Sequence, residues 1–191
     1  MGIQAGNDIQ EGKQLKELHM FYLLDISGSM EGEGIQQLNS GMRETVRILK
    51  DKFEGKGDAH LRISVMTFSN AAQWVTGMPD SKYSEYIEDF IDFPEQTAAG
   101  LTHLGDALTL LQKGLSREEM LESPTGNKRP IIIVMSDGAP NDDWESALKK
   151  IQENRCSSNP SRSPLPWEAM PRRMFSPRSS ATARVFCGSQ K

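Results

Sequence analysis

The chain has 191 residues and a formal net charge of −4, with 37% hydrophobic and 25% charged residues. These values are typical of one soluble globular domain and exclude fibrous and low-complexity proteins. No apolar run of about 18 residues occurs, which excludes a membrane-spanning helix, and the first residues lack the features of a secretory signal. The two cysteines, Cys156 and Cys187, support neither a disulfide framework nor a zinc site, so we expect a cytoplasmic protein.

Charge is distributed unevenly along the chain and divides it into three segments. Residues 156–191 carry six basic side chains and one acidic side chain, whereas residues 1–155 carry 16 basic and 25 acidic ones. We expect residues 1–17, which are polar and rich in Gln and Gly, to be a flexible leader. Residues 18–155 are then the folded domain, and residues 156–191 are a basic segment rich in Ser, Pro and Arg.

The apolar stretch over residues 18–24 predicts a buried strand, and Asp25, Ser27 and Ser29 follow directly after it. In open α/β sheets, ligands bind at the carboxyl ends of the strands. Three side-chain oxygens at that end suit a hard divalent cation such as Mg²⁺, which prefers octahedral oxygen coordination. The other ligands of such a cation must come from later segments of the chain.

The order of the predicted elements indicates the fold class. Apolar residues at steps of three and four predict helices, and alternating or continuous apolar runs predict strands. In chain order we expect a helix over residues 35–53, a strand over 61–68 and an antiparallel edge strand over 71–76. A helix that opens at residues 78–81, with its apolar face over 83–91, is expected next, followed by a helix over 104–115, a strand over 130–135 and a helix over 144–151. Asn141 or Asp142 is the expected N-cap of the last helix. This order predicts an α/β protein with a doubly wound, Rossmann-like, mostly parallel sheet and one antiparallel edge strand.

Polar residues from three loops are expected on one rim of this sheet. Right-handed crossover connections place the ends of the parallel strands, and the loop before the 104–115 helix, at the same carboxyl edge. That edge gathers five oxygen donors: Asp25, Ser27, Ser29, Thr102 and Asp137. Neither a complete dinucleotide fingerprint nor a Gly-Lys-Ser/Thr phosphate loop is present.

These motifs resemble the von Willebrand factor A domain with its metal-ion-dependent adhesion site. The family pattern has Asp-x-Ser-x-Ser after the first strand, a Thr in a Gly-containing loop before a helix, and Asp-Gly after the fourth strand. In this chain the pattern reads Asp25-Ile-Ser27-Gly-Ser29, Gly100-Leu-Thr102-His-Leu-Gly105 and Ser136-Asp137-Gly138. The resemblance covers residues 18–155, the N-terminal two thirds of the family's domain, so we expect its C-terminal strands to be lost or replaced.

The resemblance also implies how the site works. Ser27, Ser29 and Thr102 would bring hydroxyl oxygens to Mg²⁺, or to Mn²⁺ or Ca²⁺, and Asp25 and Asp137 would act directly or through water. One coordination position would then remain for an Asp or Glu of a partner protein. This is binding chemistry and requires no bond to be broken.

Other polar residues near these motifs have simpler interpretations. We expect His103 to be a rim or helix-start contact, because Mg²⁺ sites favour oxygen ligands. Asp106 fits the first turn of a helix, where the helix dipole favours acids. Residues 141–143 fit helix capping better than a second metal site, and Trp74 and Met78 are expected to pack against the edge hairpin.

An enzyme is the main alternative to a binding module. A strand-end Asp with Mg²⁺ also occurs in haloacid-dehalogenase-type phosphatases, where a second Asp two residues later is the general acid. Ser27 occupies that position here and cannot donate a proton in the same way. A Mg²⁺-dependent, phosphatase-like hydrolase therefore stays the less favoured alternative.

Within the superfamily, three stretches are most similar to the bacterial tellurium-resistance-associated proteins of TerY type. These stretches are residues 22–30, 63–68 and 101–108. The resemblance implies an intracellular, metal-dependent protein-binding module linked to stress response. Alternatives are an adaptor of a chelatase or AAA+ ATPase and an extracellular adhesin, and the lack of a signal and of paired cysteines argues against the adhesin. We expect neither nucleic acid nor membrane as a partner.

Residues 156–191 do not continue the pattern of the fold. Codons chosen for this segment and read one frame over can encode a strand, a Gly-Asp loop, an amphipathic helix and another apolar strand, which the family requires next. We hypothesise that a frameshift replaced the native C-terminus, which the gene sequence would test. If the segment is native, we expect it to be disordered and the uncovered edge of the 131–135 strand to promote self-association.

Overall fold

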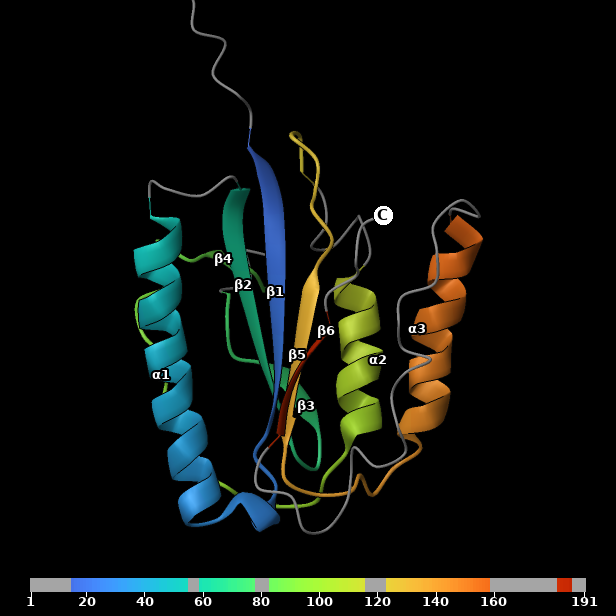
Figure 1. Ribbon diagram of the computed structural model, residues 1–191. Coiled ribbons are helices and arrows are strands. Elements are labelled where there is room, and N and C mark those ends of the chain that lie inside the picture. The colour runs from blue at the N-terminus through green and yellow to red at the C-terminus, as the bar shows by residue number, and fades with distance from the viewer. Residues whose placement is uncertain (1–14, 55–58, 78–82, 116–122, 159–181, 187–191) are drawn as a thin grey trace, which may run out of the picture.

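The computed structural model describes residues 15–54, 59–77, 83–115, 123–158 and 182–186. Within these residues the chain forms six strands, three α-helices and one short 3₁₀ helix (Figure 1). Their bounds are β1 Lys16–Asp25, η1 Gly28–Met30, α1 Glu33–Phe53, β2 Ala59–Phe68, β3 Ala72–Trp74, β4 Glu85–Tyr86, α2 Leu104–Gly114, β5 Ile131–Ser136, α3 Trp144–Ser158 and β6 Thr182–Phe186.

The sheet has the order β3-β2-β1-β5-β6, with β4 paired to β2 beside this path. β1 runs parallel to both β2 and β5, and the short β3 is antiparallel to β2 at the edge. The predicted fold class, a doubly wound α/β sheet with a parallel centre and an antiparallel edge strand, is confirmed. β4 and β6 are further antiparallel strands, on β2 and β5 respectively.

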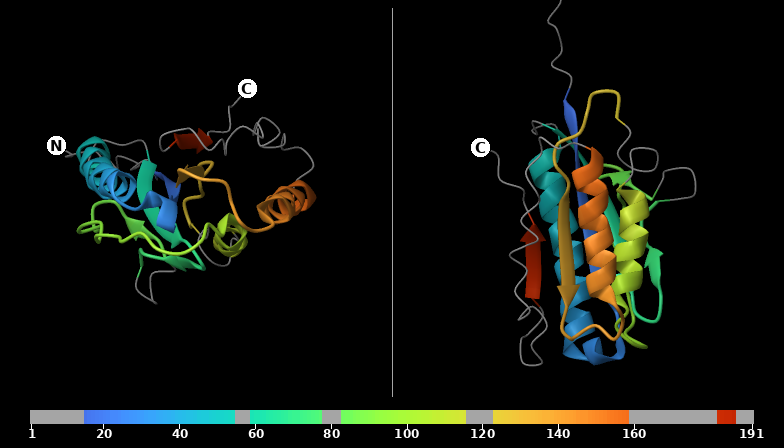
Figure 2. Two further views of the ribbon diagram at one scale, coloured as in Figure 1. Left: turned by 90° about the horizontal axis from the view of Figure 1, so that it is seen from below. Right: turned by 90° about the vertical axis from the view of Figure 1, so that its right-hand side faces the viewer.

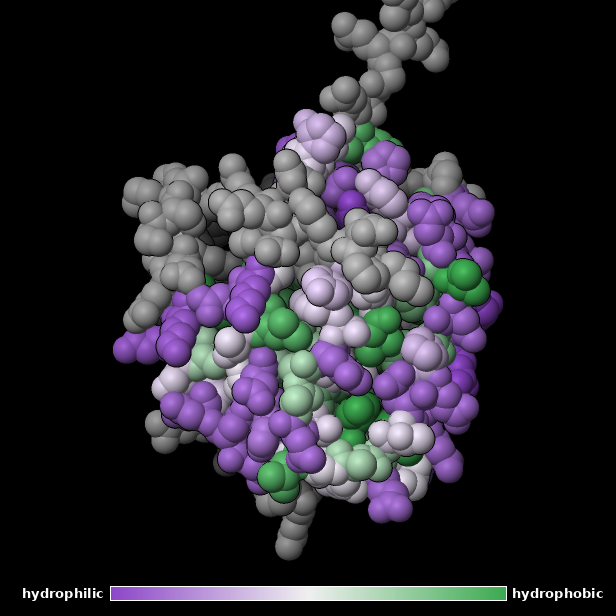
Figure 3. All heavy atoms as spheres, turned by 180° about the vertical axis from the view of Figure 1, so that it is seen from behind, coloured by the Kyte–Doolittle hydropathy of each residue, from purple (hydrophilic) through white to green (hydrophobic). Residues whose placement is uncertain are grey.

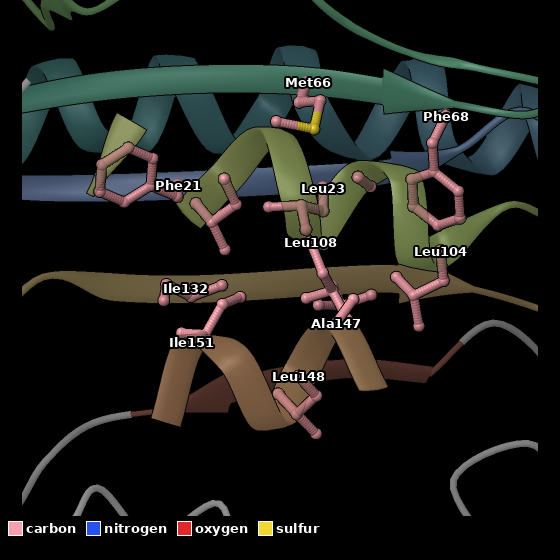
Figure 4. Packing of buried hydrophobic residues seen from close by; sticks show 13 residues of the cluster. Phe21, Leu23, Met66, Phe68, Leu104, Leu108, Ile132, Ala147, Leu148 and Ile151 are labelled. Atoms are coloured by element: carbon pink, nitrogen blue, oxygen red, sulfur yellow. The ribbon is translucent and has the colours of Figure 1, made fainter. Parts of the chain in front are cut away.

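The sheet lies between two helical layers (Figure 1). Successive side chains of a strand point to opposite faces, so β1 contributes to two cores. Phe21 and Leu23 pack with α2 and α3 (Figure 4), whereas Tyr22 and Leu24 pack on the side of α1. Burying each such large apolar side chain contributes roughly 1.5–3 kcal/mol, which makes these two layers the main stabilising feature. The helices that follow β1 and β5, which are α1 and α3, therefore cover opposite faces of the sheet, and such folds bind ligands at the carboxyl ends of two strands related in this way.

The prediction of a helix that opens at residues 78–81 is wrong for residues 83–91, and its first residues, 78–82, lie outside the described residues. Tyr83 has a left-handed backbone (φ 58°), and Glu85–Tyr86 forms β4 on the side of β2. The apolar spacing that predicted the helix is satisfied instead by a single turn, in which the Phe90 N–H donates to the Tyr86 carbonyl at 3.1 Å. Ile91, which belonged to the predicted apolar face, is 92% exposed.

The expected uncovered edge of β5 is also not observed. β6 pairs antiparallel with residues 132–136 of β5, from Ile132 opposite Phe186 to Ser136 opposite Thr182. Figure 2 shows β6 beside the sheet, and α3 extends to Ser158. The expectation of disorder is therefore wrong for 156–158 and 182–186, and the remainder of the basic segment lies outside the described residues.

The surface of the described residues is mixed in character. Figure 3 shows single hydrophobic side chains among hydrophilic ones across the visible face. The large hydrophobic side chains that are exposed, Ile48, Tyr83, Ile91 and Leu101, come from separate parts of the chain. None of the described helices is long and apolar enough to span a membrane.

Candidate metal centre

The carboxyl ends of β1 and β5 bring Asp25 and Ser136 together. The register of the two strands pairs Leu24 with Met135, so Asp25 and Ser136 are the next residues on each strand. The Ser136 hydroxyl donates a hydrogen bond of 2.5 Å to Asp25 Oδ2. Asp25 Oδ1 accepts a second hydrogen bond, from the Ser27 N–H at 2.8 Å. Both carboxyl oxygens are therefore oriented by the protein.

Asp25 is fully buried, and this affects its acidity. Burial raises the pKa of the Asp25 carboxyl, and the nearby Asp137 charge acts in the same direction. The hydrogen bonds from Ser136 and Ser27 oppose that rise in pKa, because they favour the ionised form. A carboxylate in this setting favours a nearby positive charge.

A chain of side-chain hydrogen bonds joins the two strand-end loops. The Ser27 and Ser29 hydroxyl oxygens lie 3.0 Å apart, and the Ser29 hydroxyl donates to Asp137 Oδ1 at 2.8 Å. Ser27 is buried, whereas Ser29 is exposed. Three of the five predicted donors are thus in direct contact, and Asp25 adjoins them through the Ser27 backbone.

The Thr102 loop is fixed against the Asp25 loop by backbone hydrogen bonds. The Ala99 N–H donates to the Ile26 carbonyl at 2.8 Å, and the Gly28 N–H donates to the Gly100 carbonyl at 2.9 Å. Thr102 is buried, and its hydrogen bonds within the described residues are made by its backbone. Its hydroxyl makes no hydrogen bond to the described residues, so the structure fixes the Thr102 backbone and does not join the hydroxyl to the other four donors.

Asn70, in the turn between β2 and β3, holds the same loop from the other side. Its side-chain Oδ1 accepts a hydrogen bond of 2.8 Å from the Leu101 N–H. Gly100 has a φ of +85°, and a Cβ there would lie 2.8 Å from the Asn70 side chain, so a glycine is required. The sequence analysis assigned no role to Asn70, whose only signal is its position in a short hairpin turn.

Asn141 and Asp142 connect the β5–α3 loop to the Thr102 loop, which corrects the N-cap prediction. The Thr102 N–H donates to Asn141 Oδ1, and the Asn141 N–H donates to the Thr102 carbonyl, both at 2.9 Å. Asp142 Oδ2 accepts from the Asp106 N–H at 3.2 Å. The residue that caps α3 is Asp143, whose Oδ1 accepts from the Ser146 N–H at 3.2 Å, and this lowers the pKa of Asp143.

The neighbouring residues behave as predicted. His103 is the N-cap residue of α2, with its ring Nδ1 3.0 Å from the Asn70 carbonyl oxygen. Asp106 lies in the first turn of α2. Trp74 packs beside Phe21, with ring centroids 6.4 Å apart, and Met78 lies outside the described residues.

The chemistry of this donor set fits a hard divalent cation. It consists of carboxylates and hydroxyls, which are the ligands that Mg²⁺ and Ca²⁺ accept, and it contains no thiol or imidazole. The part of the chain that the structure describes has no cluster of three or more His, Cys, Asp or Glu side chains suited to a metal.

Several solved structures are similar to this chain at low sequence identity. The ArnB paralog VWA2 from Sulfolobus acidocaldarius is 22% identical (TM-score 0.47) and is matched over 68% of this chain and 29% of its own. The pilus adhesin SpaC from Lactobacillus rhamnosus GG is 17% identical (TM-score 0.48), with 66% of this chain and 16% of its own covered.

Proximal thread matrix protein 1 from the mussel byssus, in a structure with a zinc-occupied MIDAS motif, is 22% identical (TM-score 0.42). It is matched over 71% of this chain and 34% of its own. The chain thus spans about a third or less of the length of each of these proteins. A comparison with curated proteins finds no match.

The family is shown by the sequence itself. The family model of the von Willebrand factor type A domain matches residues 20–159, which include all five predicted donors and every element from β1 to α3 except the first residues of β1. This chain therefore belongs to the von Willebrand factor type A domain family.

Proposed function

We propose that this protein is a metal-dependent protein-binding module without catalytic activity. Asp25, Ser27, Ser29, Thr102 and Asp137 would hold one divalent cation, with Mg²⁺ the first candidate and Mn²⁺ or Ca²⁺ the alternatives. Domains of this family generally mediate metal-dependent protein interactions. A bound cation would supply an electrophilic position for an Asp or Glu of the partner.

The observation that carries the proposal is the contact between donors from distant parts of the sequence. Ser29 bridges Ser27 and Asp137, so hydroxyl and carboxylate oxygens of two loops already lie within hydrogen-bond distance of one another. The Ser27 and Ser29 hydroxyls can rotate away from each other, because a hydroxyl is both donor and acceptor. Their lone pairs can then face a cation.

The protein around these donors would position them. Ser136 and the Ser27 backbone orient Asp25, and Asn141 orients the Thr102 backbone. Such supporting hydrogen bonds fix the direction of metal ligands and contribute strongly to metal affinity. Asp25 has both oxygens engaged in this way, which favours a role through water over direct coordination.

We further propose a cytoplasmic setting in a bacterial stress or tellurium-resistance system. The support is the similarity of residues 22–30, 63–68 and 101–108 to the TerY-type proteins. An adaptor role beside a chelatase or AAA+ ATPase is the alternative within the same binding chemistry. Co-purification partners from the source cell, with and without chelator, distinguish the two.

Cation binding by the proposed ligands is tested by removing one hydroxyl group without changing the shape of the side chain. Thr102→Val should weaken Mn²⁺ or Mg²⁺ binding by at least about tenfold, because a direct ligand is lost. Thr109→Val is the matched control, since the Thr109 hydroxyl bonds to the Gly105 carbonyl within α2, 2.9 Å away. Binding is measured by calorimetry and by the electron paramagnetic resonance of Mn²⁺, with circular dichroism to verify the fold.

Unchanged cation affinity in a folded Thr102→Val protein would contradict the proposed ligand set. The enzyme alternative has its own test on the same preparation. Release of phosphate from an aryl phosphate ester that depends on Mg²⁺ and disappears in Asp25→Asn would favour the hydrolase instead.

A further inference from the structure

The loops around the candidate metal centre carry many acids and no strong base. They comprise residues 25–34, 69–71, 96–106 and 136–146, all at the carboxyl end of the parallel strands, which the left view of Figure 2 faces. These four segments contain no Lys or Arg and only one His, His103. Their acidic residues are Asp25, Glu31, Glu33, Asp106, Asp137, Asp142, Asp143 and Glu145.

Most basic residues of the described part of the chain lie toward the other end of the molecule, whereas Lys149 and Lys150, in the first half of α3, lie nearer the acidic loops. On α1 they occupy the second half, and on α2 the last turn. The basic residues of the described elements and loops are Lys16, Arg43, Arg47, Lys50, Lys52, Arg62, Lys113, Lys128, Arg129, Lys149, Lys150, Arg155 and Arg184. The charge of Lys150 contributes to the lowered pKa of Asp143, which is one of the acids of these loops.

Helix dipoles account for part of this acidic rim but not for all of it. Glu33, Asp106 and Glu145 lie in the first turns of α1, α2 and α3, where the positive end of a helix favours acids. Glu31 and Asp142 lie outside the helices. Eight carboxylates also exceed what one divalent cation and three helix ends of about half a charge each can neutralise.

This excess of negative charge restricts the partner. A carboxylate that approaches the cation must also enter the negative field of the rim acids, which salt screens over a Debye length of about 10 Å at 0.1 M. An isolated acidic loop would be repelled, whereas Lys or Arg beside the carboxylate would be attracted by exposed acids such as Glu31 and Glu33.

We propose that the partner presents its metal-binding Asp or Glu within a surface rich in Lys and Arg. This proposal rests on the proposed function, because it concerns the occupant of the same site. The cation would select the carboxylate, and the rim acids would select its basic neighbours. A basic flank should therefore raise both the association rate and the affinity, and more so at low salt.

Synthetic peptides with one central Asp test this inference directly. Three peptides have the same length and differ only in the four residues that flank the Asp: these are all Lys, all Ser or all Glu. A fourth peptide is the Lys peptide with its Asp replaced by Asn. Binding to the full chain is measured by fluorescence anisotropy at saturating Mg²⁺, at low salt and at about 0.15 M salt. We expect the Lys peptide to bind at least about tenfold more tightly than the Ser peptide, and the Asn peptide to lose most of this affinity.

Two charge-reversal variants separate a local effect from net charge. Glu31→Lys with Glu33→Lys should reduce the preference for the Lys peptide several-fold. Glu88→Lys with Asp89→Lys makes the same change in net charge in the turn after β4, which pairs with the opposite half of β2. That control should leave the preference unchanged.

The outcomes distinguish this inference from the proposed function. Equal affinity for the Lys and Ser peptides, with binding that still requires Mg²⁺, overturns the inference and leaves the proposed function standing. Binding of the Lys peptide that survives both EDTA and the Asp-to-Asn change overturns the inference, as does an equal effect of both charge-reversal variants. The proposed function fails separately if the wild-type protein binds neither Mn²⁺ nor Mg²⁺ in the titrations that compare it with Thr102→Val.

Discussion

At the scale of single residues, the candidate centre is organised around a buried carboxylate. Asp25 is fully buried, and both of its oxygens accept hydrogen bonds from residues of its own chain. A buried ionised group without such partners would cost far more than a typical hydrogen bond contributes. The supporting residues are therefore as necessary to the site as the donors.

Ser136→Ala tests this dependence. The change leaves Asp25 Oδ2 without its 2.5 Å donor, so we expect a loss of about 1.5–3 kcal/mol in the free energy of unfolding, the range for hydrogen bonds to charged groups. Urea denaturation with and without Mg²⁺ measures it. Ser40→Ala on α1 is the control: its hydroxyl bonds to Gln36 in an exposed turn, and the change should stay within about 0.5 kcal/mol. Equal effects of both changes would contradict the role of Ser136.

The sequence predicts the donors at this scale but not their supports. Asp25, Ser27 and Ser29 follow a strand directly, so their position at the sheet edge is set by the chain itself. Ser136 needs the register of β1 with β5, and Asn141 needs the path of a loop that a local pattern does not encode. The assignment of the five residues as metal ligands stays a prediction.

At the scale of elements, the spacing of apolar residues correctly predicts a helix that packs against the sheet along its length. α1 buries Leu38, Met42 and Val46 at steps of four, and its predicted extent is confirmed. The 83–91 segment has a similar apolar spacing but lies beside β2 in a two-residue strand followed by a turn. A short periodic run cannot distinguish a helix from a turn that buries the same side chains.

Two glycines in helices should respond to the same substitution with opposite signs. Gly105→Ala at the start of α2 puts a Cβ 2.7 Å from Asp142 Oδ2, and we expect a loss of stability of about 1–3 kcal/mol. Gly41→Ala in α1 meets nothing within 4 Å and should stabilise the protein by about 0.5–1 kcal/mol. Thermal and urea unfolding measure both. A Gly105→Ala protein as stable as the wild type would show that α2 does not pack tightly against the loop between β5 and α3.

At the scale of the whole molecule, the end of the sheet opposite the candidate centre contains a second buried polar group. Glu17 on β1 accepts a hydrogen bond from the Tyr86 hydroxyl at 3.0 Å and lies 3.8 Å from Arg62. His19, 1% exposed, lies 3.3 Å from Glu17. Burial lowers the pKa of His19, with the Arg62 charge adding to this, while Glu17 opposes it.

The lowered pKa of His19 predicts a loss of stability in acid. Below the ordinary pKa of 6.5 the unfolded chain takes up a proton that the folded protein binds less readily. Stability is therefore full above that pH and falls as the pH drops through it toward the folded-state pKa. Urea denaturation between about pH 5 and 8 should show a smaller acid loss in His19→Gln than in the wild type. An unchanged pH dependence in that variant would contradict the role of His19.

Prediction was least successful for long-range pairing along the basic segment. Its composition gave no periodic signal, yet residues 182–186 pair with β5, because a strand edge accepts any backbone that can complete its hydrogen bonds. The frameshift hypothesis for residues 156–191 stays a prediction. The strands β1, β2 and β5 were predicted from local patterns, because buried strands are apolar runs, but their order in the sheet was not predicted and comes from the structure.

The turn between β2 and β3 carries a final consequence. Three residues span it, and it holds the Thr102 loop through the Ser69 carbonyl, which accepts from the His103 N–H at 2.9 Å, and through the Asn70 side chain. One inserted amino acid would shift both acceptors and displace the loop. Genes of this lineage should therefore tolerate insertions and deletions at the far end of the sheet, while the length of this hairpin stays constant over evolutionary time.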